Sequence, residues 1–214
     1  MKASDDMAAE GRRTARVVQE RSISTRAELL DGAARVFSRL TYAEARLKDV
    51  ADESGISAGS MYFHFGNKVD LAQAILQVQQ ERMTAALTEV LEQELTGLDA
   101  LLAIADRLSQ LIASDITVQA GIKLGLQPGT GLDADANGPY FEWIRITESL
   151  IRQGGEDGSI KPELDAAAAA EYVNVVFVGA QLLSEIEDTW ASFPERFQRV
   201  RPHIVGFLSS QPRD

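Results

Sequence analysis

Residues 57–68 combine side chains that suit binding to a nucleic-acid backbone. Ser57 and Tyr62 carry hydroxyl groups, His64 carries an imidazole and Lys68 an ammonium group. Groups of this kind contact phosphate oxygens in protein–DNA complexes. The residues at positions 58–60 are small, which allows the backbone to approach base edges in a major groove about 12 Å wide. The segment therefore predicts a DNA-contacting surface.

Two short predicted helices, one over 47–54 and one starting at 57, must position these groups. Gly55 lies between them and can adopt the positive φ that a tight turn between helices often requires. An apolar seam of Val50, Ala51, Ile56 and Met61 would hold the pair together. Similar pairs occur in many all-α proteins, where Tyr62 would be a core aromatic and Lys68 a solvated residue. The pattern alone leaves both interpretations open.

The distribution of charge matters more than the net charge of −11 over 214 residues. Residues 11–68 hold ten Lys and Arg against seven Asp and Glu, a net charge of +3. Residues 69–214 hold ten against twenty-two, a net charge of −12. An acidic C-terminal part repels DNA, whereas the N-terminal part tolerates it. Composition therefore permits DNA binding at one end of the molecule.

Several other function classes are disfavoured by composition. The chain has no cysteine and only two histidines, so we expect no disulfide, no thiolate or multi-histidine metal site and no cofactor. No Gly-rich phosphate loop or acid pair supports an enzyme. No apolar run approaches the roughly 18–20 residues that cross a bilayer, and no hydrophobic leader follows the first residues. A cytoplasmic protein that is not an enzyme is expected.

Apolar residues recur at helical spacing along nearly the whole chain, which predicts an all-α fold. Residues 1–21 are polar and are expected to form a flexible arm. Asn67 is a good N-cap for a long helix, Gly154-Gly155 should separate two helices, and Pro202 should kink or shorten the last one. Residues 125–139 are rich in Gly and Pro and should form a loop. The expected helices cover 24–39, 47–54, a short stretch from 57, 67–93, 98–113, 139–153, 164–187 and 193–209.

Taken together, the order and spacing of these residues resemble the DNA-binding domain of TetR-family transcriptional regulators. The matching residues are Thr25-Arg26, Leu29-Leu30, Ala33-Ala34 and Phe37, then Val50-Ala51, Gly55-Ile56-Ser57, Gly59, Met61-Tyr62, His64-Phe65, Lys68 and Leu71. The resemblance implies a three-helix helix-turn-helix domain over 22–68. A helical bundle over 69–214 would then provide ligand binding and dimerisation.

The resemblance also assigns roles to individual residues. It places Ser57, Ala58, Gly59, Ser60 and Phe63 in the major groove. It implies phosphate contacts from Tyr62, His64, Lys68, Thr25, Arg26 and Lys48. Two positions depart from the family pattern: Thr41 stands where Gly is usual, and Arg46 replaces the usual Ser or Thr cap of the second helix. Either the loop is reshaped, or Arg46 exchanges capping energy for a phosphate contact, and we favour the second.

Within the family, two short runs resemble γ-butyrolactone-type autoregulator receptors. They are residues 116–124 and residues 139–144, and the second run contains Trp143. In that subgroup the matching tryptophan lines the ligand pocket, although a lone tryptophan at helical spacing is more often a core residue. The candidate ligand-binding residues are Gln80, Met83, Gln119, Trp143 and Phe177.

The resemblance implies a ligand-responsive repressor that binds a near-palindromic operator as a homodimer, without a membrane partner. The helices at 164–186 and 197–208 would form the dimer surface, although close packing inside one subunit would give the same composition. A largely apolar effector would lower operator affinity by binding. A repressor that answers to an antibiotic or another lipophilic compound is the main alternative. A protein-interaction module without DNA contact is disfavoured by Lys48 and Lys68.

Overall fold

The computed structural model describes residues 2–127, 132 and 138–211. Within these residues the regular secondary structure is helical, apart from one isolated β-bridge between Ile160 and Ser209. This agrees with the all-α expectation. The helices are α1 (Lys2–Arg39), α2 (Leu47–Ser54), α3 (Ala58–His64), α4 (Lys68–Leu91), α5 (Gly97–Ser114), α6 (Ile116–Leu126), α7 (Gly138–Asp157), α8 (Ala166–Asp188) and α9 (Phe193–Leu208).

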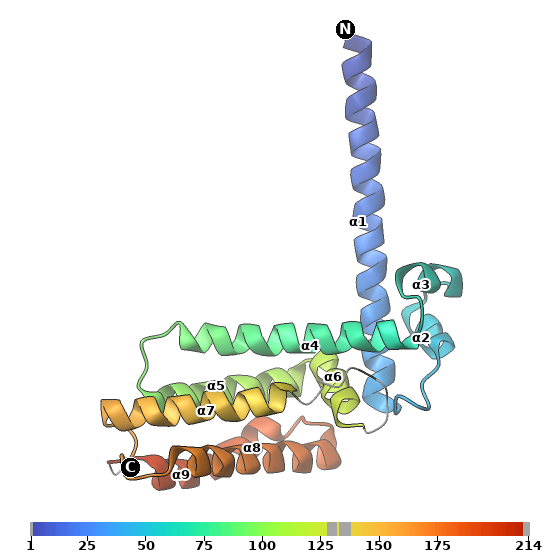
Figure 1. The fold of residues 1–214 in the computed structure, drawn as a ribbon. Helices are drawn as coiled ribbons and strands as arrows, with labels where there is room; N and C mark the ends of the chain where they lie inside the picture. Colours follow the sequence, from blue (N-terminus) through green and yellow to red (C-terminus); the bar gives the residue numbers. More distant parts are fainter. Residues whose placement is uncertain (1, 128–131, 133–137, 212–214) are drawn as a thin grey trace.

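The C-terminal half of α1 packs with α2 and α3 to form a small head at one end of the molecule (Figure 1). Leu29 and Phe37 of α1, Val50 of α2 and Met61 of α3 are all buried in one apolar cluster. Gly55 ends α2 with φ of 71°, the left-handed conformation expected for this turn. The predicted ends of α2, the start of α3 at the Ser57 cap and the Asn67 cap of α4 are confirmed.

The rest of the chain forms a helical bundle in which α5 contacts α7 and α9, and α8 contacts α7 and α9. Figure 1 shows α4 running from the head along the bundle, with α6 lying where head and bundle meet. A second apolar cluster fills the bundle. Ala120 and Leu124 of α6 belong instead to the cluster of the head, so the head core extends beyond residues 22–68.

Residues 2–21 differ from the predicted flexible arm because they continue α1 as helix. Figure 1 shows this part of α1 projecting well past α2 and α3. Residues 7–10, Met-Ala-Ala-Glu, are good helix formers. Farther along, Arg16 and Glu20 form an ion pair at i,i+4 with 2.8 Å between nitrogen and oxygen. The helix propensity of these residues and the ion pair between Arg16 and Glu20 thus favour a helix, which the prediction of a flexible arm did not take into account.

The glycines at 154 and 155 do not separate two helices, since α7 continues through them to Asp157. They allow a close crossing instead: a Cβ on Gly97 of α5 would lie 2.3 Å from the Gly154 nitrogen. Likewise α9 continues past Pro202 to Leu208, so the proline does not shorten it. The structure also places a separate helix, α6, ahead of the predicted loop, much of which lies outside the described residues.

Helix α8 is more apolar than the sequence prediction allowed. It is the one described helix whose length and hydropathy would permit membrane crossing, with a mean hydropathy of 1.4 over its most apolar window. Part of that window packs inside the bundle, where Phe177 and Ala180 are buried. A core helix of a globular bundle passes the same test, so this is weak evidence for a membrane segment.

Candidate DNA-binding surface and effector cavity

Helix α3 presents an unobstructed outer face. The Ser57 hydroxyl accepts a hydrogen bond from the Ser60 backbone N–H at 3.3 Å, which fixes the first turn. Apart from its chain neighbours and the backbone of its own helix, no atom of the described residues lies within 4 Å of where a Cβ on Gly59 would be, so its neighbourhood is open. Ser57, Ala58 and Gly59 are exposed and Ser60 is half-buried. The small residues predicted to read bases are therefore accessible.

Two aromatic rings extend from the same helix into solvent. Phe63 is 82% exposed and Tyr62 is 57% exposed, whereas Met61 between the helices is buried. The Phe63 ring meets the half-buried His64 ring edge to face, with 5.2 Å between centroids. The Phe63 ring therefore leaves apolar surface in water, where it is available to an apolar group of a partner.

Two cationic side chains lie on the helices that pack against α3. Lys48, in the first turn of α2, is exposed. The Arg26 guanidinium of α1 lies 5.1 Å from the centroid of the buried Phe65 ring, which holds it beside the end of α3. Thr25 is half-buried next to it. Helices α1 and α2 therefore carry a cation each beside α3.

The loop before α2 contains the two departures from the family pattern, Thr41 and Arg46. The Thr41 hydroxyl donates to Glu44 Oε2 at 2.7 Å, and the Glu44 backbone N–H donates back to the Thr41 hydroxyl at 3.3 Å. The bond from the Thr41 hydroxyl, together with one from the Thr41 backbone N–H to the same carboxylate oxygen, lowers the pKa of Glu44. This is a reciprocal capping pair, recognisable as Thr-x-x-Glu. The bonds between Thr41 and Glu44 thus give the loop a local hydrogen-bonded turn, and they leave the choice between a reshaped loop and an Arg46 phosphate contact open.

Arg46 occupies the cap position of α2 with its side chain exposed. A guanidinium has no acceptor atom, so Arg46 cannot cap the helix with its side chain. Instead its backbone N–H donates to Asp49 Oδ2 at 2.8 Å. Among the described residues the Arg46 guanidinium has no hydrogen-bond partner, which leaves it available for an external anion.

Lys68 is used inside the protein rather than displayed on the surface. Its ammonium donates to the Tyr42 carbonyl at 2.7 Å and to the Ala45 carbonyl at 3.0 Å. It also lies 4.4 Å from the centroid of the Tyr42 ring. The structure therefore gives Lys68 a role in holding the 40–46 loop against α4, which differs from the phosphate contact expected from the sequence.

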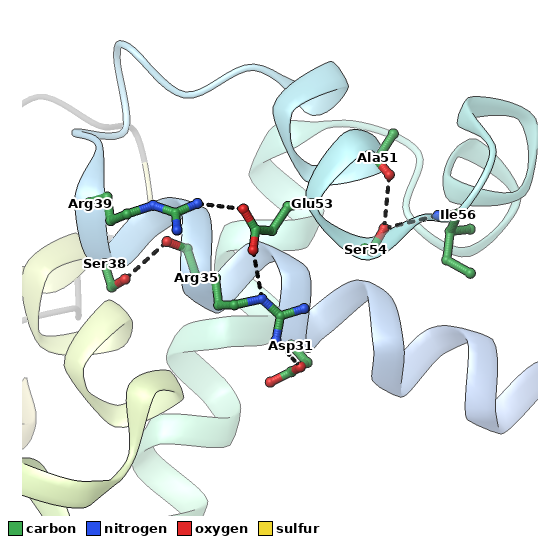
Figure 2. Close-up of polar contacts among 8 residues, drawn as sticks. All are labelled: Asp31, Arg35, Ser38, Arg39, Ala51, Glu53, Ser54 and Ile56. Atoms are coloured by element: carbon green, nitrogen blue, oxygen red, sulfur yellow. Dashed lines mark hydrogen bonds and ion pairs between the residues drawn. The ribbon is translucent and has the colours of Figure 1, made fainter.

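A carboxylate that the sequence analysis missed joins α1 to α2. Figure 2 shows Glu53 of α2 between Arg35 and Arg39 of α1, with Oε1 2.9 Å from Arg35 Nε and Oε2 2.5 Å from Arg39 Nη2. The hydrogen bond from Arg39 is the largest cause that lowers the pKa of Glu53. At the same crossing, a Cβ on Gly32 would lie 2.8 Å from the Ser54 Cβ. Spacing within α1 could not reveal a partner on another helix.

A cavity of about 60 Å³ lies inside the bundle. Five helices, α4 to α8, contribute to its wall. The lining residues are Gln79, Met83, Leu108, Ile122, Trp143, Phe177, Val178 and Gln181. The Trp143 indole N–H is buried and has no hydrogen-bond partner within the described residues, and its ring centroid lies 6.3 Å from that of Phe177. The cavity thus combines apolar walls with an unused donor.

The structure brings together three of the five predicted ligand-binding residues, namely Met83, Trp143 and Phe177. Gln119 does not line the cavity: its amide donates to the Ile112 carbonyl at 2.9 Å and fastens α6 to the end of α5. Gln80 is exposed on the outer side of α4. The adjacent Gln79 takes its place, since one step along a helix turns a side chain by about 100°.

Gln181 is the second lining amide that the sequence analysis missed. It is 6% exposed, and within the described residues its side chain has no hydrogen-bond partner. It lies four residues after Phe177, one helical turn along α8. That spacing was the available signal, because neighbours at i and i+4 share a helix face.

The outer side of α8 carries apolar residues that the subunit does not cover. Val175 is 64% exposed and Ile186 is 75% exposed. The other exposed apolar residues of α8 and α9 are Tyr172, Val178, Leu182, Leu183 and Phe207. The Tyr172 and Phe207 rings lie 4.8 Å apart and join the two helices into one face. An apolar stripe of this kind is typical of a subunit interface.

Comparison with known proteins places these features in context. A family model described as "Bacterial regulatory proteins, tetR family" matches residues 29–75. The A-factor receptor protein of Streptomyces griseus is 27% identical over 187 residues, which cover 87% of this chain and 64% of that protein. The chain therefore spans less than two thirds of that relative.

Solved structures give the same picture over most of the chain. TylP, described as a tetR regulator from Streptomyces fradiae, is 31% identical, with 86% of each chain covered and a TM-score of 0.64. A gamma-butyrolactone receptor described as ArpA-like is 23% identical, with 89% of this chain and 90% of that chain covered and a TM-score of 0.77. At that identity the second likeness shows the fold alone.

Proposed function

Because the chain belongs to the TetR family of bacterial regulatory proteins, we propose that it is a ligand-responsive transcriptional repressor. It binds a near-palindromic operator as a homodimer and releases it when a small, largely apolar effector of the γ-butyrolactone class enters the bundle. It acts in the cytoplasm, and it is not an enzyme. The names of its relatives as receptors and regulators support this assignment.

The observation that carries the DNA-binding half is the outer face of α3. The first residues of the helix are small and exposed, and the exposed Tyr62 and Phe63 follow them. We assign Ser57–Ser60 and Phe63 to the base edges, where a phenyl ring can contact a thymine methyl group. Tyr62, His64 and the surrounding cations Arg26, Arg46 and Lys48, with Thr25, bind phosphate. Lys68 acts indirectly, by holding the loop that precedes α2.

The cavity supports the effector half. Its walls are mostly apolar, and the Trp143 N–H and the Gln181 amide are polar groups without partners among the described residues. A carbonyl oxygen on an otherwise apolar ligand satisfies the indole donor, and a second polar group satisfies the amide. A lactone with an alkyl chain has this chemistry. Few, well-placed polar groups in an apolar site are what orient a neutral ligand.

The apolar face of α8 and α9 supports the dimer. Burying it against a second copy removes side chains such as Val175 and Ile186 from water, and each stabilises the dimer by about 1–2 kcal/mol. Two α3 helices of a dimer can then enter successive major grooves about 34–36 Å apart. We assign residues 22–68 to the DNA-binding domain and 69–214 to the ligand-binding and dimerisation domain.

Selection from a random DNA pool tests the proposal. The protein should enrich one near-palindromic site, and fluorescence anisotropy should show affinity for that site that falls steeply with salt. Lys48→Ala combined with Tyr62→Ala should abolish the binding, whereas Arg152→Ala on α7 should leave it unchanged. Failure to enrich any site would sink the DNA-binding assignment.

The effector half has its own test. A γ-butyrolactone that carries a saturated alkyl chain should bind the protein, quench its tryptophan fluorescence and weaken the operator complex. If such lactones bind neither the free protein nor its operator complex, the effector class is wrong even though the operator assignment stands.

A further inference from the structure

Helix α6 belongs to both halves of the molecule. Ala120 and Leu124 are fully buried in the apolar cluster of the head, with 0% and 1% exposed surface. Ile122 points elsewhere: it packs in the bundle cluster and lines the cavity. Gly121 leaves no slack on the α4 side, because a Cβ there would lie 2.5 Å from the Gln79 Cβ. A displacement of the cavity wall at Ile122 must therefore displace residues of the head core.

Polar contacts from the last turn of α6 reach the head at two points. The Lys123 ammonium donates to the Ser38 carbonyl at 2.7 Å, in the last turn of α1 where carbonyls lack helical partners. Gln127 Oε1 accepts a hydrogen bond from the Tyr42 backbone N–H at 2.7 Å. The Gln127 amide in turn donates to the Lys123 carbonyl at 3.1 Å. We call Lys123 and Gln127 the α6 clasp.

The contact at Tyr42 extends to the start of α2. The carbonyl of Tyr42 accepts from Lys68, which also binds the Ala45 carbonyl next to the α2 cap. The loop between α1 and α2 is thus held by α6 on one side and α4 on the other. Its geometry sets the direction in which α2 and α3 leave α1.

The same clasp is linked to the helix that carries the apolar outer face. Lys123 Nζ lies 3.7 Å from Glu185 Oε1 of α8 and 5.7 Å from the centroid of the Trp190 ring. Three elements therefore meet at one ammonium group: the end of α1, the cavity helix α6 and helix α8. A movement of α6 therefore changes the position of the head relative to α8, the helix that carries the surface proposed to join the two subunits.

The size of the cavity makes such a movement necessary. A volume of about 60 Å³ is small beside that of ligand sites, which usually measure about 300–1,000 Å³. A ligand of that size can therefore enter only if the side chains and helices around the cavity move apart. We propose that Lys123 and Gln127 are positioning residues that transmit this separation from the cavity to the DNA-binding head; the inference rests on the function proposed above.

The test expands the cavity in two independent ways and asks whether the head responds. The first is binding of an alkyl-substituted γ-butyrolactone, and the second is Leu108→Trp, which overfills the cavity without a ligand. When Lys123 and Gln127 are unaltered, lactone binding and Leu108→Trp should each weaken binding of the protein to the selected operator by a factor of about 5–150. In Lys123→Met combined with Gln127→Met, the factor should fall to about two or less while the lactone still binds.

Two controls separate coupling from general damage. Lys161→Met removes an ammonium that donates to the Gly206 and Phe207 carbonyls, the same kind of helix-end contact at α9, and it should leave the coupling intact. Lys123→Arg keeps a donor and a charge and should retain most of the coupling. Circular dichroism melts check that each variant is folded.

The clasp assignment is overturned if either perturbation weakens operator binding by the same factor with and without the clasp. It is also overturned if neither perturbation affects operator binding by the wild-type clasp. These outcomes are distinct from failure of the proposed function, which is judged by whether the unmodified protein enriches an operator at all.

Discussion

In the DNA-binding head, polar side chains at the helix junctions are paired, whereas in the bundle several buried polar atoms are not. Glu53 binds two arginines of α1, and Lys68 binds two carbonyls of the adjoining loop. In the bundle, five buried side-chain atoms have no hydrogen-bond partner within the described residues. They are Trp143 Nε1, Asn174 Oδ1, Trp190 Nε1, Ser192 Oγ and Arg201 Nε.

This difference separates a region built to hold one shape from a region able to accept a ligand. Each buried polar group without a partner costs about 1–3 kcal/mol, which a ligand with the complementary group can recover. Of the five atoms, only that of Trp143 belongs to a residue that lines the cavity. The paired contacts of the head, in contrast, hold its helices to one another, so α3 keeps its place within the head when the head moves relative to the bundle.

The largest expected effect concerns packing in the bundle. Gly97→Ala should lower the free energy of unfolding by about 3 kcal/mol, because the new Cβ would lie 2.3 Å from the Gly154 nitrogen and 2.4 Å from the Leu150 oxygen. Urea denaturation at fixed protein concentration measures it. Gly155→Ala is the control, since its Cβ would meet nothing closer than 3.8 Å. Equal stability of the two variants would mean that the α5–α7 crossing adapts more easily than its geometry implies.

The next effect concerns the exposed ring of the head. Phe63→Ala should weaken binding to the selected operator about thirtyfold, or about 2 kcal/mol, because the ring is available to contact bases. Its 82% exposure means that the unfolding free energy should not change. Leu91→Ala, an exposed apolar residue at the far end of α4, is the control for nonspecific loss. A large drop in stability with unchanged DNA affinity would show that Phe63 supports the head instead.

A smaller effect is expected at the unpaired donor of the bundle. Trp143→Phe keeps an aromatic ring beside Phe177 but removes the indole N–H, so lactone affinity should fall about tenfold, or about 1.4 kcal/mol. Isothermal titration calorimetry measures it. Trp190→Phe also removes an unpaired N–H, but away from the cavity lining, and should reduce stability without changing lactone affinity. Equal lactone affinities of wild type and Trp143→Phe would remove the donor from the effector site.

The smallest effect concerns the ion pairs of the head and depends on pH. The arginines lower the pKa of Glu53 in the folded chain, so its contribution to stability is complete above the ordinary carboxyl pKa of 4.5. That contribution is lost as the pH falls through the lowered value. Glu53→Gln should therefore be less stable than wild type near pH 6, and the two should converge in acid melts. A difference that persists at low pH would assign the effect to packing.

The sequence predicted the head well because its signals are local. Ser57 and Asn67 are caps whose partners lie three residues away, and Gly55 ends a helix by its own backbone conformation. The Thr41–Glu44 capping pair is equally local, because its two residues lie three positions apart, but the sequence analysis did not predict it. Exposure of the residues on α3 also followed from the pattern.

The rest depended on contacts between distant segments. Gly154 reads as a helix breaker until Gly97 of another helix is placed against it. Lys68 reads as a surface cation until Tyr42 and Ala45 are brought within reach of its ammonium. Gln79 and not Gln80 lies on the side of α4 that faces the cavity, and the two positions differ by the rotation of about 100° between neighbouring residues of a helix. Periodicity identified the helices but not their rotation about their axes.

Val178 lines the cavity, yet it is 39% exposed on the outer face of α8. One side chain thus separates the effector cavity from the surface that a second subunit would cover. Two effector sites arranged in this way would not be independent, since a ligand that moves Val178 changes the wall against which the other subunit rests. The binding curve of a dimer for its effector is then expected to deviate from a simple hyperbola, with a Hill coefficient that depends on the size of residue 178.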